Sequence, residues 1–300
     1  MVSQPHTKAG KPPIGPFRPH QGELAMDIER EVASHYSRQG LEASILDALR
    51  ATGADIDNLT SADLRGADEF HLGWHAATVA LASDLGLTKG EHVLDVGSGI
   101  GGPARYFAET CGCIVSGIDL TEDYVTVATA LTERCGLGDE VSFTKASALA
   151  LPFPSSHFDA ATLIHVGMNI PDKTALFSEI RRVLKPDGRF GVYDVMRLDD
   201  VELPFPMPWA QTSATSHVER PDTYRNALEG ASFVITAAHD RSALALDLAK
   251  AMRAKVAKDG APPLGLHLLM GPAGGQRMEN VLGALQRGHI APIAMIARAI

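Results

Sequence analysis

A cluster of glycines directly after an apolar stretch is where chemistry is first expected in this 300-residue sequence. Residues 93–96 read as a buried strand, 97–102 as a tight turn, and 104–108 as the beginning of a helix. Glycine lacks a Cβ, so a ligand can approach the backbone closely at such a turn. The first turn of the helix adds N–H groups that have no partner within the helix. We therefore predict that this turn binds a small molecule.

Two classes of ligand fit the spacing, and an acid in the preceding strand distinguishes them. Gly97-x-Gly99-x-x-Gly102 matches the dinucleotide fingerprint, whereas Gly97-x-Gly99-x-Gly101 matches the tighter turn of enzymes that use S-adenosylmethionine. Both classes bind ribose hydroxyls with a later acid, and Asp119 lies 22 residues after Gly97, close to the expected offset of about 20. A buried carboxylate at Asp95 would repel a pyrophosphate but attract the cationic amino group of a methionine moiety. We therefore favour S-adenosylmethionine.

Five segments in order along the chain resemble a known family. They are 93–102, 117–119, 151–153, 156–159 and 184–188. Together they resemble class I S-adenosylmethionine-dependent methyltransferases. Among these, the segments are most similar to the small-molecule enzymes of the ubiquinone/menaquinone and sarcosine/dimethylglycine types. The resemblance covers about residues 70–196 well and the remainder loosely.

The resemblance implies which residues hold the donor. Asp95 and the glycine turn would hold its methionine end, Asp119 its ribose, and Leu120 would lie beside the adenine. Ser147 and Ala148 would frame the base. Relatives usually have an aspartate at the position of Ser147, and a hydroxyl accepts a hydrogen bond more weakly than a carboxylate. The full predicted binding set is Asp95, Gly97, Ser98, Gly99, Gly101, Asp119, Leu120, Ser147, Ala148 and His165.

Two residues at the ends of later strands are candidates for catalysis. His165 follows the apolar stretch 158–164, at the edge where doubly wound sheets bind their ligands. Its imidazole can contact the donor or accept a proton near neutral pH, or the backbone can hold it for shape alone. Asp194, in the predicted strand 189–195, is a candidate anchor for a substrate cation or a second base. A solvated strand end explains Asp194 equally well.

A pair of histidines raises the question of a metal site. His71 and His75 are four residues apart, as in half of a zinc site. However, Leu72 replaces the glutamate of the zinc-protease motif, and Gly73 interrupts the helix. We therefore predict no metal. The resemblance places this segment beside the methionine end of the donor, where Trp74 would form an aromatic wall or pack in the core.

Composition limits the kinds of partner. A formal charge of −9 argues against a nucleic-acid substrate, because neutralising phosphates requires clustered Lys and Arg. No apolar run approaches the roughly 20 residues of a membrane span, and the first 20 residues contain no apolar signal core. The three cysteines show no metal-binding spacing and suit a reducing compartment. We expect a cytoplasmic protein.

The rest of the chain is expected to surround the site. We predict a flexible tail at residues 1–20, a helical cap at 21–85, and a methyltransferase domain at 86–300 with insertions at about 197–220 and 241–289. The cap resembles the lid over the donor in small-molecule methyltransferases, although it could also pack far from the site. The insertions would build the acceptor pocket or a homodimer contact. Trp209 and His217 would line the first insertion, or pack on its surface.

These observations predict an α/β fold with a doubly wound, seven-stranded, mostly parallel sheet, Rossmann-like and closed by an antiparallel strand at 290–300. The predicted function is methyl transfer from S-adenosylmethionine to a small molecule, leaving S-adenosylhomocysteine. The accepting atom (N, O, C or S) stays open, because the scaffold does not decide it. An NAD(P)-dependent oxidoreductase and a non-catalytic S-adenosylmethionine-binding module are the alternatives.

Overall fold

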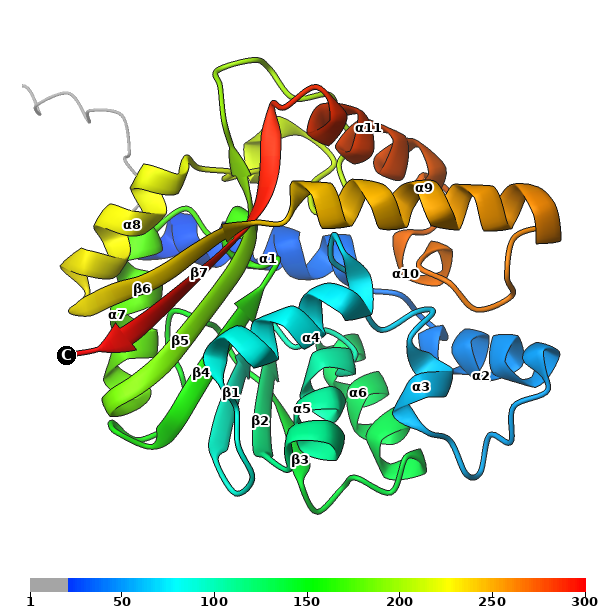
Figure 1. Cartoon of the computed structure of the whole chain (residues 1–300), viewed down its shortest axis with the longest axis horizontal. Helices are drawn as coiled ribbons and strands as arrows, with labels where there is room; N and C mark the ends of the chain where they lie inside the picture. Colours follow the sequence, from blue (N-terminus) through cyan, green and yellow to red (C-terminus); the bar gives the residue numbers. More distant parts are fainter. Residues whose placement is uncertain (1–20) are drawn as a thin grey trace, which may run out of the picture.

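The computed structural model describes residues 21–300, and the predicted tail at 1–20 lies outside the described residues. Seven strands form its central sheet: β1 (His92–Val96), β2 (Ile114–Asp119), β3 (Val141–Lys145), β4 (Phe158–Ile164), β5 (Leu184–Arg197), β6 (Phe233–Asp240) and β7 (Ile290–Ala299). Their order across the sheet is β3-β2-β1-β4-β5-β7-β6 (Figure 1).

The direction of the strands confirms the predicted fold. Strands β1 to β5 pair in parallel, whereas β7 runs antiparallel to both β5 and β6. The chain order reverses at β1, which lies between β2 and β4. Loops that leave the carboxyl ends of β1 and β4 therefore diverge, and this divergence opens a crevice for ligands.

Helices cover both faces of the sheet. They are α1 (Gln21–Tyr36), α2 (Leu41–Thr52), α3 (Ser61–Leu64), α4 (Trp74–Leu85), α5 (Gly102–Cys111), α6 (Glu122–Arg134), α7 (Lys173–Val183), α8 (Pro221–Gly230), α9 (Ser242–Asp259), α10 (His267–Met270) and α11 (Gly274–Gln286), with the 3-10 turns η1 (Gly167–Asn169) and η2 (Ser213–Thr215). Helices α4 and α5 pack on one face, and α7 and α8 on the other. Successive strand residues serve opposite faces, so Val93 contacts the first pair of helices and Leu94 the second.

One sequence-based boundary needs correction. The predicted strand at 189–195 is too short, because β5 begins at Leu184, which already pairs with Phe158 of β4. The helical insertion at 241–289 consists of three helices, α9, α10 and α11. Between residues 21 and 300, no helix has both the length and the apolar composition needed to cross a membrane.

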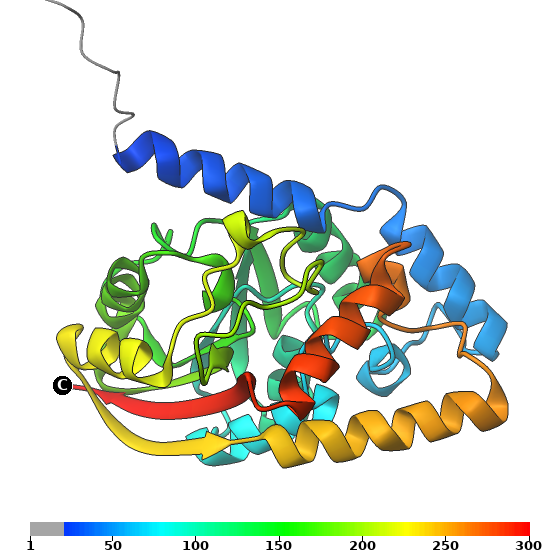
Figure 2. The ribbon, with the colours of Figure 1, turned by 90° about the horizontal axis from the view of Figure 1, so that it is seen from above.

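Helices from both ends of the chain surround the carboxyl edge of the sheet. Helix α1 and helix α9 lie on opposite sides of the molecule, with α11 between them (Figure 2). Helix α2 packs against α6 and α10, so the N-terminal helices and the second insertion meet. Residues 21–85 are thus largely helical, while their treatment as a separate cap stays a prediction.

Candidate functional site

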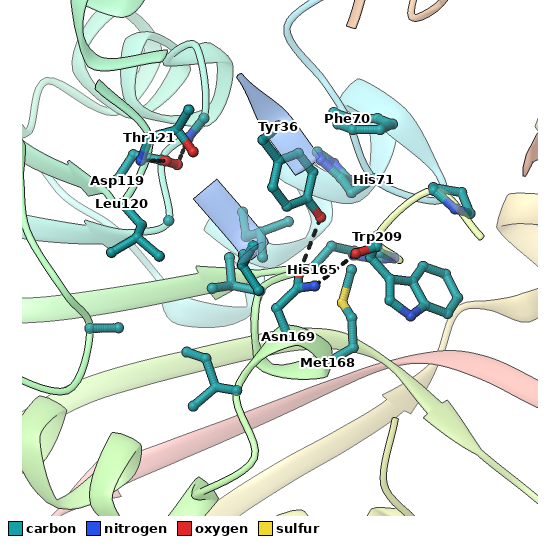
Figure 3. Close-up of a pocket in the computed structure, with 18 of the residues that line it drawn as sticks. Tyr36, Phe70, His71, Asp119, Leu120, Thr121, His165, Met168, Asn169 and Trp209 are labelled. Atoms are coloured by element: carbon teal, nitrogen blue, oxygen red, sulfur yellow. Dashed lines mark hydrogen bonds between the residues drawn. The ribbon is translucent and has the colours of Figure 1, made fainter. Parts of the chain in front are cut away.

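A cavity lies where β1, β2 and β4 end. Its floor comes from the segments that follow these strands, including Gly97, Asp119 and His165. Its walls come from α1, from the segment before α4, from η1 and from both insertions, and Figure 3 shows Tyr36, Phe70, Met168 and Trp209 among them. Most wall residues are apolar: Ile28, Val32, Phe70, Leu72, Trp74, Met168, Ile170, Pro208, Trp209, Leu266, Met278 and Val281.

The glycine turn is packed too tightly for larger residues. Gly97 has a φ of 72°, and a Cβ added to it would lie 2.3 Å from the Val166 side chain. A Cβ on Gly102 would lie 2.2 Å from the backbone oxygen of Asp68. The segment at Asp68 therefore covers the beginning of α5, where a dinucleotide would place its pyrophosphate. This packing disfavours the dinucleotide interpretation.

Three buried oxygen atoms belong to residues that line a hollow beside this turn. Asp68 Oδ1, Asp95 Oδ2 and Ser98 Oγ are buried and have no hydrogen-bond partner among the described residues. All three residues line the hollow, which shares Gly97 and Gly99 with the main cavity. Buried oxygens without donors are costly, so this arrangement suits a ligand that brings N–H groups.

The charges in the hollow favour a cation. Asp95 Oδ1 accepts a hydrogen bond from Thr162 Oγ1 at 2.8 Å, and burial raises the pKa of Asp95 to about 7. Asp68 lies 2.9 Å from the buried Arg105 guanidinium, yet burial still raises the pKa of Asp68 to about 6. An ammonium group would stabilise both ionised carboxylates. Sequence reasoning found Asp95 but missed Asp68, for which the acid pair at 68–69 was the available signal.

Asp119 is oriented by two backbone groups at the end of β2. Its Oδ2 accepts the N–H of Gly99 at 2.9 Å, and its Oδ1 accepts the N–H of Thr121 at 2.8 Å (Figure 3). Burial raises the pKa of Asp119. Each carboxylate oxygen can accept a further hydrogen bond, which suits a pair of ribose hydroxyls. The structure thus brings Asp119 and the glycine turn together, as predicted.

The predicted base-binding residues divide into two groups. Leu120 and Ala148 line the cavity, whereas Ser147 is absent from its described lining. The Ser147 hydroxyl donates to the carboxylate of Glu29 and accepts the N–H of Leu149 at 3.0 Å. Glu29 itself lines the cavity from α1. Sequence reasoning missed Glu29, because nothing in the residues around it indicates that α1 reaches the loop after β3.

His165 lines the cavity but is not free to accept a proton. Its Nε2 lies 3.3 Å from the backbone nitrogen of Leu72, and an N–H can only donate, so Nε2 accepts. The neutral ring then carries its proton on Nδ1, and burial lowers the pKa of His165 well below its usual value. The backbone at His165 is left-handed, with a φ of 53°, as it is at Trp74, with a φ of 44°. Such strain in bulky residues is concentrated at functional sites.

Asp194 lies beneath the cavity and is not among its described lining residues. It is fully buried, and its Oδ2 accepts the Tyr224 hydroxyl at 2.6 Å. A Cβ on Gly167 would lie 2.4 Å from that oxygen, so the η1 turn rests directly on this carboxyl group. Burial raises the pKa of Asp194 to about 6. Asp194 therefore supports η1, and a solvated strand end is ruled out.

The two histidines near Gly73 are held by protein groups. His75 Nδ1 bonds to buried Glu69 at 2.9 Å, and His71 Nε2 bonds to the backbone oxygen of Trp74 at 3.0 Å. His71 precedes α4, so the two histidines do not share a helical face. The described residues contain no group of three His, Cys, Asp or Glu side chains suited to a metal ion.

The aromatic residues expected around the acceptor are only partly in place. Trp74 and Trp209 line the cavity, whereas His217 is not among the described lining residues. The backbone oxygen of Trp209 accepts a hydrogen bond from Asn169 at 2.9 Å, and Asn169 accepts one from the Tyr36 hydroxyl at 3.1 Å (Figure 3). This chain of bonds joins the first insertion, η1 and α1 at one end of the cavity.

Comparison with known proteins places the site in a family context. Residues 94–192 match a family model described as a methyltransferase domain. Sterol 24-C-methyltransferase ERG6B of Gibberella zeae is 41% identical over 119 residues, which are 40% of this chain and 31% of that protein. The chain thus spans about a third of the length of this relative.

Solved structures share the fold at low sequence identity. Geranyl diphosphate C-methyltransferase from Streptomyces coelicolor A3(2), solved with Mg²⁺, geranyl-S-thiolodiphosphate and S-adenosyl-L-homocysteine, has a TM-score of 0.65 and 16% identity, covering 91% of this chain and 98% of its own. The [4+2]-cyclase SpnF has a TM-score of 0.61 and 22% identity, covering 90% of this chain and 96% of its own. Residues 94–192 are therefore a methyltransferase domain, and the chain has the fold of class I S-adenosylmethionine-dependent methyltransferases.

Proposed function

We propose that this chain transfers a methyl group from S-adenosylmethionine to a small, apolar acceptor. The observation that carries the proposal is the hollow beside the glycine turn, where Asp68, Asp95 and Ser98 offer three buried oxygens without partners. Those oxygens suit the ammonium group of the donor, and the adjoining apolar cavity suits an acceptor.

The protein's part in the reaction is to position the reactants and exclude water. The donor supplies an activated methyl group on a sulfonium, which an acceptor displaces in line. Asp68, Asp95 and Ser98 hold the methionine end, Asp119 holds the ribose, and Leu120 and Ala148 flank the base. Held this way, the donor gains the alignment that accelerates a displacement without covalent catalysis by the protein.

The cavity walls support an apolar acceptor. Among the described residues that line it, none is Lys or Arg. A phosphorylated acceptor would therefore find no Lys or Arg partner among these lining residues. A relative that acts on a sterol agrees with the apolar lining. The accepting atom is left open.

His165 and Asp194 are proposed to position groups. His165 lines the reacting end, and its Nε2 fixes the segment at Leu72 through a hydrogen bond. Asp194 supports η1, whose residues Met168 and Asn169 line the cavity. Neither residue offers a free base in this arrangement, so the proposed reaction relies on alignment.

Calorimetric titration tests this proposal against the oxidoreductase alternative. The protein is titrated separately with S-adenosylhomocysteine, NADH and NADPH. We expect binding of S-adenosylhomocysteine alone, because the segment at Asp68 fills the pyrophosphate position. Binding of either nicotinamide nucleotide in its place would reject the proposal. Because a [4+2]-cyclase shares this fold, binding of the donor does not by itself show methyl transfer, which a methyl-labelled donor tests separately.

The proposed setting is the cytoplasm, with a free small molecule as substrate and no nucleic acid. A homodimer is also a prediction, and light scattering of the purified protein tests it. A mass of one chain, about 31.9 kDa, would reject the dimer.

A further inference from the structure

We propose that Glu29 of α1 binds the adenine amino group of the donor, so that donor binding holds α1 over the acceptor cavity. This inference rests on the proposed function. The hydrogen bond to the adenine amino group, expected from Ser147 in the loop after β3, would then come from α1.

The base end of the cavity offers apolar walls and a carboxylate. Leu120, Ala146, Ala148 and Leu149 line it from the ends of β2 and β3. The 6-amino group of adenine is a hydrogen-bond donor and needs an acceptor at this end. Asp119 is oriented by Gly99 and Thr121 for the ribose, which leaves Glu29 as the carboxylate available to the base.

Ser147 orients Glu29 towards this position. Its hydroxyl donates to Glu29 Oε1, and its oxygen accepts the N–H of Leu149, so the serine links α1 to the loop after β3. A carboxylate has about four lone-pair positions, so one hydroxyl leaves capacity for the adenine amino group. The Ser147 hydroxyl orients the Glu29 carboxylate, and the carboxylate accepts from the adenine amino group. In relatives, a single aspartate in the loop would provide this acceptor.

One face of α1 spans both ends of the cavity. Ile28, Glu29, Val32 and Tyr36 all line it, at spacings that place them on one side of a helix. At the opposite end from Glu29, the Tyr36 hydroxyl donates to Asn169. A donor held by Glu29 would therefore fix the helix whose other end closes the acceptor part of the cavity. The donor should bind before the acceptor.

The test compares two ligands that differ at the adenine amino group. The full chain is titrated with S-adenosylhomocysteine and with S-inosylhomocysteine, in which an oxygen acceptor replaces the amino donor. The wild type should prefer S-adenosylhomocysteine, because the inosine oxygen would face a carboxylate. In Glu29→Gln, affinity for S-adenosylhomocysteine should fall about tenfold. The preference between the ligands should narrow, because the amide can donate to the inosine oxygen.

A matched control separates the contact from the helix. Glu31 lies exposed on the same helix, so Glu31→Gln should leave both affinities and their ratio unchanged. If Glu29→Gln also keeps the wild-type ratio while the wild type binds S-adenosylhomocysteine, the inference is wrong and the proposed function stands. If the wild type binds neither ligand, the proposed function fails as well.

A double variant provides the reciprocal result. Glu29→Gln combined with Ser147→Asp moves the carboxylate from α1 to the loop after β3. The preference for S-adenosylhomocysteine should return, because a charged acceptor again lies at the base end. If Glu29 has only a structural role, the double variant should not recover this preference. No recovery in the double variant, together with an unchanged ratio of the two ligand affinities in Glu29→Gln, would overturn the inference.

Discussion

Asp95 lies fully inside the molecule and lines the hollow beside the glycine turn, with one oxygen bound by Thr162 and the other without a partner among the described residues. Its pKa, raised to about 7 by burial, means that the folded chain holds a proton there that the unfolded chain releases near pH 4. The ionised form therefore lowers stability above neutral pH. A cation in the hollow would remove that cost, which links ligand binding to this residue.

Replacing Asp95 with asparagine separates stability from binding. Asp95→Asn should raise the free energy of unfolding of the ligand-free protein by about 1 kcal/mol at pH 8, because no charge is buried. Affinity for S-adenosylhomocysteine should fall about 30-fold or more, because the ammonium loses its partner. Urea denaturation and calorimetry measure the two effects. Exposed Asp139→Asn is the control, and equal behaviour of the two variants would contradict the assignment.

The dependence of binding on pH follows from the same pKa values. Asp68 and Asp95 have pKa values raised to about 6 and about 7, so both are mostly protonated at pH 5.5 and ionised at pH 8. The ligand's ammonium binds the ionised forms, so affinity for S-adenosylhomocysteine should rise across this window and level off above it. Stability without ligand should change in the opposite direction, because the folded state binds more protons. Calorimetry at several pH values checks this, and a flat profile in the wild type would count against the site.

Sequence spacing identified some binding residues but not others. Asp95 and Asp119 stand at fixed positions relative to the glycine turn, so the local pattern predicts their placement. Glu29 reaches the site from α1 and Asp68 from the loop between α3 and α4, and only the packing of these N-terminal segments brings them there. The single acid expected at Ser147 is replaced by two residues 118 positions apart.

At the scale of elements, local patterns predicted most of the sheet and the helices on its faces. Apolar residues and the closing Gly86 predict a helix over residues 74–85, which is α4 in the structure. Periodicity also predicted the helix α9, but not its environment, since Met252 and Val256 remain 46% and 38% exposed. The position of the segment at Asp68 over α5 was not predictable, because it depends on a close approach between two elements rather than on either pattern.

Gly102 tests that close approach. In Gly102→Ala, the added Cβ would lie 2.2 Å from the Asp68 backbone oxygen, so one element must move. We expect a loss of about 1–3 kcal/mol in the free energy of unfolding, together with weaker binding of S-adenosylhomocysteine. Gly275→Ala is the matched control, because its Cβ meets nothing within 4 Å and alanine favours a helix. The assignment fails if Gly102→Ala is as stable as this control and binds as well.

At the scale of the whole molecule, the cavity is assembled from segments far apart in the chain. Its described lining runs from Ile28 in α1 to Val281 in α11, and both tryptophans of the chain, Trp74 and Trp209, take part. The sequence predicted that insertions would surround the acceptor but not that their walls would be apolar, because wall character depends on which residues face inward. The apolar walls and the donor hollow together lead to the proposed reaction.

The most direct test of that reaction follows a methyl label from the donor. The protein is incubated with methyl-labelled S-adenosylmethionine and a cell extract, which is then separated into organic-soluble small molecules, water-soluble small molecules, protein and nucleic acid. We predict label in an organic-soluble small molecule, and much less of it with Asp95→Asn at a limiting donor concentration. Label in protein or nucleic acid, or no label although the donor is bound, would contradict methyl transfer to an apolar small molecule.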